Sequence, residues 1–276
     1  MVQPKKSLGQ NFLRCDWVVD EIIRAAELTT EDTVLEIGPG TGVLTRALAK
    51  KAGRVIAVEK DEHLASELRI FLKKEGVQNV EIITGDILKI LPNLFSSYNP
   101  PPTTYNLLPT IYKLVANIPY YLTGHLFRMI FEQEHLPKTI VLTIQKEVAE
   151  RVASRPPHSN LLALSVQAFG TPEIIAVVPA SCFFPQPKVD SAILKISDIS
   201  GDFFRKNKVG KAVFFETARR GFSQKRKTLV NSLALLAGGD KSAIAQVLLA
   251  VGLDPRARPE ELSLKQWTEL IRSLPR

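Results

Sequence analysis

The sequence predicts an α/β protein that combines a mostly parallel, doubly wound sheet with a small all-helical domain at its carboxyl end. Apolar, β-branched runs alternate with amphipathic helical stretches over residues 33–144, and strands joined by a helical crossover run parallel. Two later apolar runs are joined by a loop rich in Phe and Pro, so they should form an antiparallel pair at one edge. Beyond residue 198 all patterns are helical, and we therefore expect domains at residues 1–198 and 199–276.

Each strand is expected where a short apolar run is bounded by turn residues. The runs cover residues 33–37, 54–59, 80–84, 113–117, 138–144, 173–178 and 191–196. A helical pattern at residues 160–169 separates the fifth run from the sixth. Breakers at Gly238-Gly239 and Asp254-Pro255 help to place the later helices at residues 207–219, 224–236, 241–250 and 260–274. Residues 92–109 contain five prolines and should form a long extended loop.

Length and composition fit one full-sized core and a second, smaller one, because the chain has 276 residues and 45% of them are hydrophobic. Cys15 and Cys182 lack paired spacing, so we expect neither a disulfide framework nor a zinc site, and a reducing compartment. No stretch approaches the length of a membrane span, and no signal-peptide core follows Lys5 and Lys6. The expectation is a soluble, cytoplasmic protein without a metal, since the histidines also lack ligand spacing.

The net charge of +8 is concentrated in one short segment. Residues 205–227 contain nine Lys or Arg and one acid, Glu216, which accounts for the whole excess. A run of charge is often only the solvated face of a helix. Because Phe214, Phe215 and Phe222 are interleaved with the basic residues, the segment favours a polyanion footprint with rings that could stack on bases.

A glycine-rich turn follows the first strand, where Glu36 precedes the repeated glycines Gly38, Gly40 and Gly42. A dinucleotide fingerprint would have its third glycine at position 43, which is valine here. Glycines let the backbone approach a ligand closely. The turn therefore favours an adenosyl ligand with a sulfonium amino acid over a pyrophosphate.

Two acids end the next two strands. The carboxylate of Glu59 can accept hydrogen bonds from both hydroxyls of a ribose, and Asp86 can accept one from an adenine amino group. Each acid alone is more typical of a helix cap. The carboxyl ends of neighbouring parallel strands converge on one crevice, however, so the acids and the glycines together predict a nucleoside site.

The fourth strand leads into Asn117-Ile118-Pro119-Tyr120, which alone could be a simple Pro turn. An aromatic amine has its lone pair delocalised into the ring, so a protein that alkylates it needs acceptors that draw the nitrogen toward tetrahedral geometry. The side-chain oxygen of Asn117 and the backbone carbonyl of Ile118 can each accept one amine hydrogen. Pro119 stiffens the turn, and the Tyr120 ring can stack on a base. Downstream of the glycine-rich turn, this motif predicts methylation of a base amine.

With these motifs the chain resembles the bacterial small-subunit ribosomal RNA adenine dimethyltransferases, a branch of the class I S-adenosylmethionine-dependent methyltransferases. The resemblance covers nearly the whole chain. The segments that carry it are residues 10–13, 36–45, 58–60, 85–86, 117–120, 145–149, 183–191, 222–229 and 258–263. It implies a Rossmann-like sheet and S-adenosyl-L-methionine as cofactor. It also implies a monomeric enzyme that dimethylates two adjacent adenosines at N6, in a hairpin loop near the 3′ end of 16S rRNA within an immature 30S subunit.

The resemblance also implies roles for particular residues. Phe183 would help to hold the target base together with the residues 117–120. The residues implied for the cofactor pocket are Asn11, Leu13, Gly38, Gly40, Glu59, Asp86 and Asn117. The basic residues that would hold the RNA backbone are Arg219, Arg220, Lys225, Arg226 and Lys227.

Three alternatives stay open. A dimethyltransferase for large-subunit rRNA would share the chemistry, but the motifs at residues 222–229 and 258–263 argue against it. A DNA adenine methyltransferase would use a related acceptor motif, but no separate target-recognition region is evident. A non-catalytic assembly or transcription factor could keep the fold and bind RNA. The presence of Glu59, Asp86 and Asn117 argues against that role.

Overall fold

The computed structural model describes residues 4–5, 8–94, 109, 111–224 and 226–274, so most of the loop expected at residues 92–109 lies outside the described residues. The chain divides into two compact units. The sheet unit comprises Met1–Ala149 and Pro172–Ile199, and the helical unit comprises Glu150–Thr171 and Ser200–Arg276. One division between the units falls after Ile199, and residues 150–171 group with the helical unit and not with the sheet.

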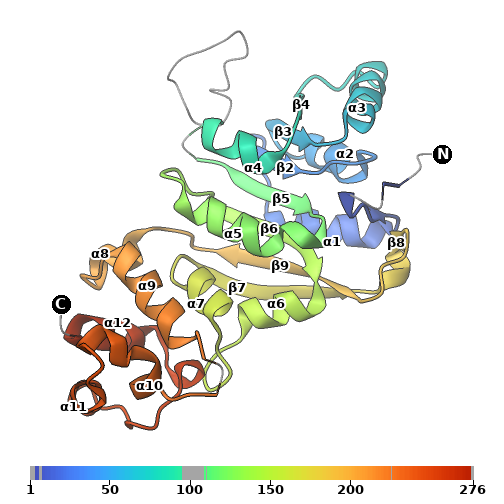
Figure 1. Ribbon diagram of the computed structural model, residues 1–276. Helices are drawn as coiled ribbons and strands as arrows, with labels where there is room; N and C mark the ends of the chain where they lie inside the picture. Colours follow the sequence, from blue (N-terminus) through green and yellow to red (C-terminus); the bar gives the residue numbers. More distant parts are fainter. Residues whose placement is uncertain (1–3, 6–7, 95–108, 110, 225, 275–276) are drawn as a thin grey trace. The chain divides into compact units, whose positions relative to one another are not determined.

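A seven-stranded sheet is the centre of the sheet unit as described, with the order β4-β3-β2-β5-β6-β9-β7 (Figure 1). Its strands are β2 (Thr33–Ile37), β3 (Arg54–Glu59), β4 (Val80–Thr84), β5 (Lys113–Asn117), β6 (Thr139–Gln145), β7 (Thr171–Val178) and β9 (Ser191–Ser197). Strands β2 to β6 run parallel to one another, whereas β9 runs antiparallel to β6. The predicted mostly parallel sheet with an antiparallel edge region is confirmed.

Helices cover both faces of this sheet because the strands are apolar on both sides. On one face, strand residues such as Val34, Val55 and Val115 pack in a buried core with α1 (Asp16–Ala26) and α2 (Val43–Ala49). The opposite face is covered by α5, which lies in front of the sheet in Figure 1. The other helical elements of the sheet unit are α3 (Glu62–Lys74), α4 (Ile87–Ile90), η2 (Leu91–Asn93), η3 (Tyr120–Leu122), α5 (Thr123–Glu132), α6 (Lys146–Ala153, which continues into the helical unit) and η4 (Ala180–Cys182).

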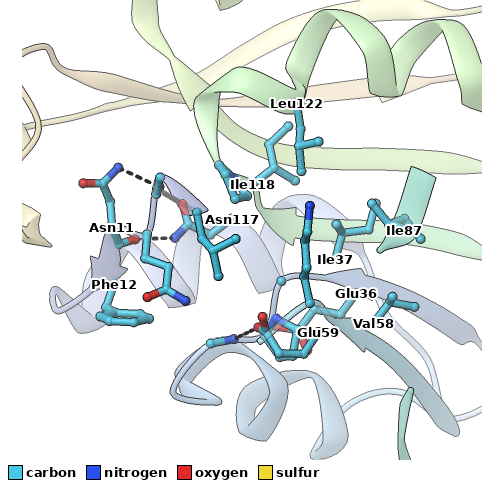
Figure 2. A pocket seen from close by; sticks show the side chains of 18 of the residues that line it. Asn11, Phe12, Glu36, Ile37, Val58, Glu59, Ile87, Asn117, Ile118 and Leu122 are labelled. Carbon is cyan, nitrogen blue, oxygen red and sulfur yellow. Dashed lines mark hydrogen bonds between the residues drawn. The ribbon is translucent and has the colours of Figure 1, made fainter. Parts of the chain in front are cut away.

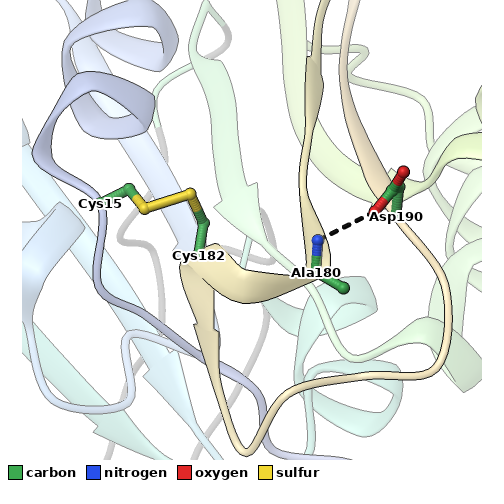
Figure 3. Close-up of a disulfide and its surroundings, with 4 residues drawn as sticks. All are labelled: Cys15, Ala180, Cys182 and Asp190. Carbon is green, nitrogen blue, oxygen red and sulfur yellow. Dashed lines mark hydrogen bonds between the residues drawn. A yellow bond between two sulfur atoms is a disulfide. The ribbon is translucent and has the colours of Figure 1, made fainter.

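A second, two-stranded sheet attaches the amino-terminal segment to the rest of the unit. Strand β1 (Phe12–Leu13) pairs antiparallel with β8 (Phe183–Phe184), and the backbone N–H of Arg14 donates to the Cys182 carbonyl at 2.8 Å. Directly beside this ladder Cys15 and Cys182 form a disulfide, with their Cα atoms 5.1 Å apart (Figure 3). The expectation of unpaired cysteines was wrong. The two residues are 167 positions apart, and only the β1–β8 pairing brings them together.

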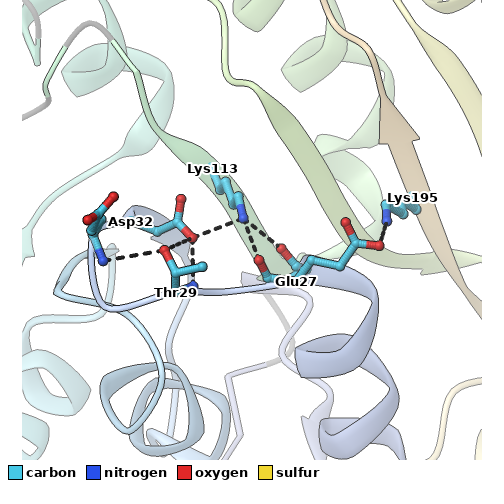
Figure 4. Close-up of polar contacts among 7 residues, drawn as sticks. Glu27, Thr29, Asp32, Lys113 and Lys195 are labelled. Atoms are coloured by element: carbon cyan, nitrogen blue, oxygen red, sulfur yellow. Dashed lines mark hydrogen bonds and ion pairs between the residues drawn. The ribbon is translucent and has the colours of Figure 1, made fainter.

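A buried lysine fixes the amino-terminal end of the central strand β5 (Figure 4). The Lys113 ammonium donates to the carbonyls of Ala26 at 3.1 Å and Glu27 at 2.7 Å, and to the Asp32 carboxylate at 3.0 Å. These carbonyls belong to the carboxyl end of α1, where a cation is favourable. Burial would raise the pKa of Asp32, but the hydrogen bonds from Thr29 and Lys113 outweigh burial and lower it.

The helical unit contains the helices expected beyond residue 198, with shifted ends. Residues 207–219 were expected as one helix, but α9 covers Lys211–Gly221, and the predicted helix at 224–236 begins only at Leu229. The elements are α7 (Leu161–Gln167), α8 (Asp202–Lys206), α9, α10 (Leu229–Leu233), η5 (Ala234–Ala237), α11 (Lys241–Ala250), η6 (Pro259–Glu261) and α12 (Leu264–Ser273). Among the described residues no single helix could cross a membrane, although the bent pair Leu229–Ala237 and Lys241–Ala250 passes that test by length and composition.

Aromatic rings form the core of the helical unit. Phe214 is fully buried and makes edge-to-face contacts with Phe204 and Phe215, and Phe222 stacks on Trp267. The suggestion that the rings of this basic segment form a stacking surface for bases is therefore not supported. Because Phe214 and Phe215 follow each other in α9, both cannot face solvent on a helix that packs against its neighbours.

Candidate active site

One pocket lies at the carboxyl ends of strands β2 to β5 in the sheet unit (Figure 2). Its walls are drawn from five segments, and the lining residues fall within 8–13, 36–44, 58–60, 85–87 and 117–122. All of the residues predicted to bind a cofactor lie on these walls, as do the predicted acceptor residues 117–120. The structure thus brings together motifs that are up to about one hundred residues apart, as the switch-point rule for parallel sheets requires.

The glycine-rich turn is fixed by the acid that ends β3. The carboxylate of Glu59 accepts from the backbone N–H of Gly40 at 2.9 Å and from that of Asp61 at 2.8 Å. Burial raises the pKa of Glu59, although these hydrogen bonds oppose the shift. Gly40 has φ +57°, and a Cβ there would lie 3.1 Å from the ring of Phe12. Only glycine leaves the pocket wall in this position undisturbed.

Glu36 is a buried acid on the floor of the same pocket. It is 1% exposed, and its Oε2 has no hydrogen-bond partner among the described residues. Burial raises the pKa of Glu36 to about 8, the nearby Glu59 carboxylate adds to this shift, and Thr45 opposes it. Near neutral pH the carboxyl is therefore largely protonated, and an unpartnered polar oxygen is presented to whatever fills the pocket.

Asp86 is the N-cap residue of α4 and has two roles in the structure. Its Oδ1 accepts from the backbone N–H of Leu88 at 3.0 Å, which is a helix cap, and its Oδ2 accepts from Lys60 at 2.8 Å. Burial would raise the pKa of Asp86, but the hydrogen bond from Lys60 and the cap lower it. A carboxylate oxygen can accept more than one hydrogen, so the cap does not prevent Asp86 from binding a ligand amine.

The acceptor motif is oriented by the amino-terminal segment. The side-chain amide nitrogen of Asn117 donates to the backbone carbonyl of Asn11 at 3.1 Å (Figure 2). The other end of the carboxamide, Oδ1, is consequently the atom left to accept a hydrogen bond. No group among the described residues donates to the backbone carbonyl of Ile118. Two neighbouring acceptors are thus available at the end of β5.

Tyr120 is held at its far end. Its hydroxyl lies 2.7 Å from the hydroxyl of Ser191, the fully buried first residue of β9. Burial raises the pKa of Tyr120, with a further contribution from Asp190 and an opposing one from Ser191. Pro119 has φ −57° and precedes the short helix η3 that begins at Tyr120. The ring is therefore positioned by β9, a contact that the sequence motif alone did not indicate.

Phe183, expected to hold the target base, is instead only 3% exposed and belongs to the sheet-unit core. Side chains alternate along a strand, so when Phe183 points into the core its neighbour Phe184 points outward and is 39% exposed. The pocket is not lined by Phe183. A role for Phe183 in holding the target base stays a prediction.

The amino-terminal segment is the part of the site that sequence reasoning described least well. Lys5 forms an ion pair with Asp61 at 2.9 Å, and the side-chain amide of Gln10 donates to the same carboxylate at 3.3 Å. These contacts and the β1–β8 ladder hold residues 8–13, called the strap from here on, along one wall of the pocket. The only sequence signal for the strap was the family resemblance at residues 10–13.

The basic residues predicted to hold RNA lie in the helical unit, apart from Lys225, which lies outside the described residues. Arg219 and Arg220 are in the last turn of α9, and Arg220 forms an ion pair with Glu216 at 2.8 Å. Arg226 and Lys227 follow the helix and are exposed. Part of the charge in this segment is thus neutralised locally.

The sheet order, the antiparallel β9 and the pocket at the carboxyl ends of β2 to β5 define a class I methyltransferase. The model of the ribosomal RNA adenine dimethylase family matches residues 1–275, and the chain belongs to that family.

Relatives of known name are similar over almost the full length. A ribosomal RNA small subunit methyltransferase A from Dehalococcoides mccartyi is 41% identical over 98% of this chain and 88% of its own. The protein of the same name from Moorella thermoacetica is 39% identical over 98% and 92%. Among solved structures, a dimethyladenosine transferase from Plasmodium falciparum is 28% identical with a TM-score of 0.75, covering 94% of this chain and 95% of its own. The 23S rRNA methyltransferase ErmE is 26% identical with a TM-score of 0.71, covering 96% and 99%.

Proposed function

We propose that this protein transfers methyl groups from S-adenosyl-L-methionine to the N6 amines of two adjacent adenosines. The substrate is a hairpin loop near the 3′ end of 16S rRNA, presented in an immature 30S subunit. The names of the two bacterial relatives support the small-subunit assignment. The single observation that carries the chemistry is the orientation of Asn117, whose amide nitrogen is engaged by Asn11 and whose oxygen is left to accept from an amine.

The pocket fits the proposed cofactor. The turn at Gly40 leaves room that a Cβ would fill, and the buried unpartnered oxygen of Glu36 offers a partner for a cationic amino-acid group. Glu59 and Asp86 would accept from the ribose hydroxyls and the adenine amine, and the strap residues Asn11 and Leu13 would complete the wall. When bound, the cofactor supplies an electrophilic methyl group on a sulfonium sulfur.

The residues at the end of β5 would prepare the acceptor. Asn117 Oδ1 and the carbonyl of Ile118 would each accept one hydrogen of the adenine amine, which localises the lone pair on nitrogen. The Tyr120 ring, fixed by Ser191, would stack on the base. No strong general base is required, because the alkylated amine loses its proton readily. The protein contributes chiefly positioning and polarisation.

The helical unit would hold the RNA backbone through Arg219, Arg220, Lys225, Arg226 and Lys227, since exposed guanidinium and ammonium groups attract phosphates. The target base must leave its stack to enter the pocket of the sheet unit. We place the protein in the cytoplasm, where 30S subunits assemble, and propose that it acts as a monomer.

A large-subunit RNA substrate is the second candidate, because the fold is shared with the 23S rRNA methyltransferase ErmE. Identity of 41% to a small-subunit enzyme against 26% to ErmE favours the small subunit. A non-catalytic assembly factor would need no oriented amine acceptor, so the Asn117 geometry argues against it.

The test is to incubate the protein with labelled cofactor and with undermethylated 30S or 50S subunits, then digest the RNA and identify the modified nucleoside. We expect dimethyladenosine from the 30S substrate alone. Asn117→Ala should lower the labelling rate by about 10²–10³, while Gln133→Ala, which removes a carboxamide outside the pocket, should not. Label on cytosine, on 50S RNA or on nothing would contradict the proposal.

A further inference from the structure

An arginine and a phenylalanine form an exposed stack beside the pocket. The guanidinium carbon of Arg14 lies 4.1 Å from the centre of the Phe184 ring. Arg14 is exposed, and Phe184 is 39% exposed although it is apolar. No carboxylate among the described residues lies within ion-pairing distance of Arg14, so its N–H groups are available to a partner from solution.

The β1–β8 ladder connects this stack with the pocket wall. Phe12 and Phe184 are direct partners in the ladder, and such partners project from the same face. Arg14 is two residues beyond Phe12 and shares that face. Phe12 lines the pocket, and its ring abuts Gly40. The stack therefore lies at the rim of the site and outside its lining.

The loop that carries Phe184 is fastened at both ends (Figure 3). The Asp190 carboxylate accepts from the backbone N–H of Ala180 at 2.9 Å, and the disulfide to Cys15 fixes Cys182. The same loop presents Lys188, which is exposed. The exposed ring and Lys188 of this fastened loop, together with Arg14 on the segment paired with it, form a preorganised surface, which lowers the entropy lost on binding.

We propose that Arg14 and Phe184 bind the nucleotide that flanks the target adenosine in the RNA. The base of that nucleotide would stack on the ring, and the guanidinium would donate to its phosphate. Aromatic rings paired with Arg suit single-stranded RNA, in which splayed bases present their faces. This inference rests on the proposed function, and it adds to the sheet unit an RNA contact separate from the basic segment of the helical unit.

The experiment compares the methylation kinetics of the wild type with those of Arg14→Met, Phe184→Leu and Arg14→Lys on undermethylated 30S subunits. Arg14→Met keeps most of the packing stem and removes the charge. The matched control is Arg128→Met, because Arg128 is exposed, pairs locally with Glu132 and lies outside the pocket lining. Cofactor affinity is measured separately by calorimetry, since it reports whether the strap is intact.

We expect KM for the subunits to rise about tenfold in Arg14→Met and Phe184→Leu, with kcat and cofactor affinity unchanged. Arg14→Met should also reduce the slope of log affinity against log salt by about 0.7, the value for one phosphate contact on a single strand. Arg14→Lys should restore the salt slope but not the full affinity, because an ammonium does not stack as a planar guanidinium does. Arg128→Met should behave as wild type.

The outcomes separate this inference from the function on which it rests. If wild-type protein methylates the subunits and both variants keep the wild-type KM, the RNA contact is refuted and the proposed function stands. A loss of cofactor affinity in both variants would also refute it, because the stack would then only support the strap. If wild type methylates no RNA, both proposals fail together.

Discussion

Replacing Asn117 by alanine should separate two effects that the structure links in one side chain. Alanine removes the Oδ1 acceptor from the amine site and also removes the donor to the Asn11 carbonyl, which lies 3.1 Å from the amide nitrogen. Loss of one preorganised polar group at a reacting centre lowers kcat by about 10²–10³, or about 3–4 kcal/mol. Loss of the hydrogen bond to the partly buried strap costs about 1 kcal/mol and should weaken cofactor binding about fivefold.

The assay is single-turnover methylation of undermethylated 30S subunits at saturating cofactor, with cofactor affinity measured by calorimetry. Asn117→Asp provides the comparison. It keeps an acceptor at the same position but cannot donate to Asn11, so it should weaken cofactor binding at least as much as alanine does while retaining more of the rate. A wild-type single-turnover rate in Asn117→Ala would refute the reasoning, because the oriented carboxamide would then have no part in the chemistry.

Three further predictions concern the stability of the sheet unit, and each is measured by urea unfolding of the full-length protein. Lys113→Met should lower the free energy of unfolding by about 3–5 kcal/mol, because it leaves buried carbonyls and a carboxylate without their cation. Arg128→Met, which breaks an exposed ion pair, should lower it by less than about 1 kcal/mol. Equal effects of the two substitutions would contradict the account. Cys15→Ser should cost about 2–5 kcal/mol, because the crosslink spans 167 residues, and a dithiol reductant should destabilise the wild type but not the variant. Glu36 keeps its proton in the folded state up to about pH 8, while its ordinary pKa is 4.5, so the unliganded protein should lose stability as pH rises through that interval. Glu36→Gln should abolish this part of the pH dependence, and an unchanged profile would show that Glu36 is not the group responsible.

The parallel strands could be predicted because each is a local pattern. Residues 33–37 and 54–59 are short β-branched runs bounded by turn residues, and the structure has strands β2 and β3 with those bounds. The pocket position then followed from topology, since the strand ends of a parallel sheet meet at one edge. The acids at Glu59 and Asp86 and the acceptor motif at Asn117 therefore converge as expected.

What could not be predicted depends on contacts between distant residues. The ladder of β1 with β8 has only two residues per strand, so neither strand carries a periodic pattern, and nothing local links Cys15 to Cys182. The hydrogen bond from Asn117 to Asn11 and that between Tyr120 and Ser191 arise from the same tertiary arrangement. The misplaced start of the helix expected at residue 224 has a different cause, because Gln224, Arg226 and Lys227 are good helix formers by propensity, yet the first helical residue of α10 is Leu229.

The most direct test of the central claim is a crystal structure of the protein with S-adenosyl-L-homocysteine and adenosine, or with a short RNA that carries the target loop. We expect the adenine N6 within hydrogen-bonding distance, about 2.7–3.2 Å, of both Asn117 Oδ1 and the carbonyl of Ile118, with the amide nitrogen of Asn117 still on Asn11. An adenine amine directed elsewhere in the pocket, or an Asn117 carboxamide turned so that its nitrogen faces the base, would contradict the account.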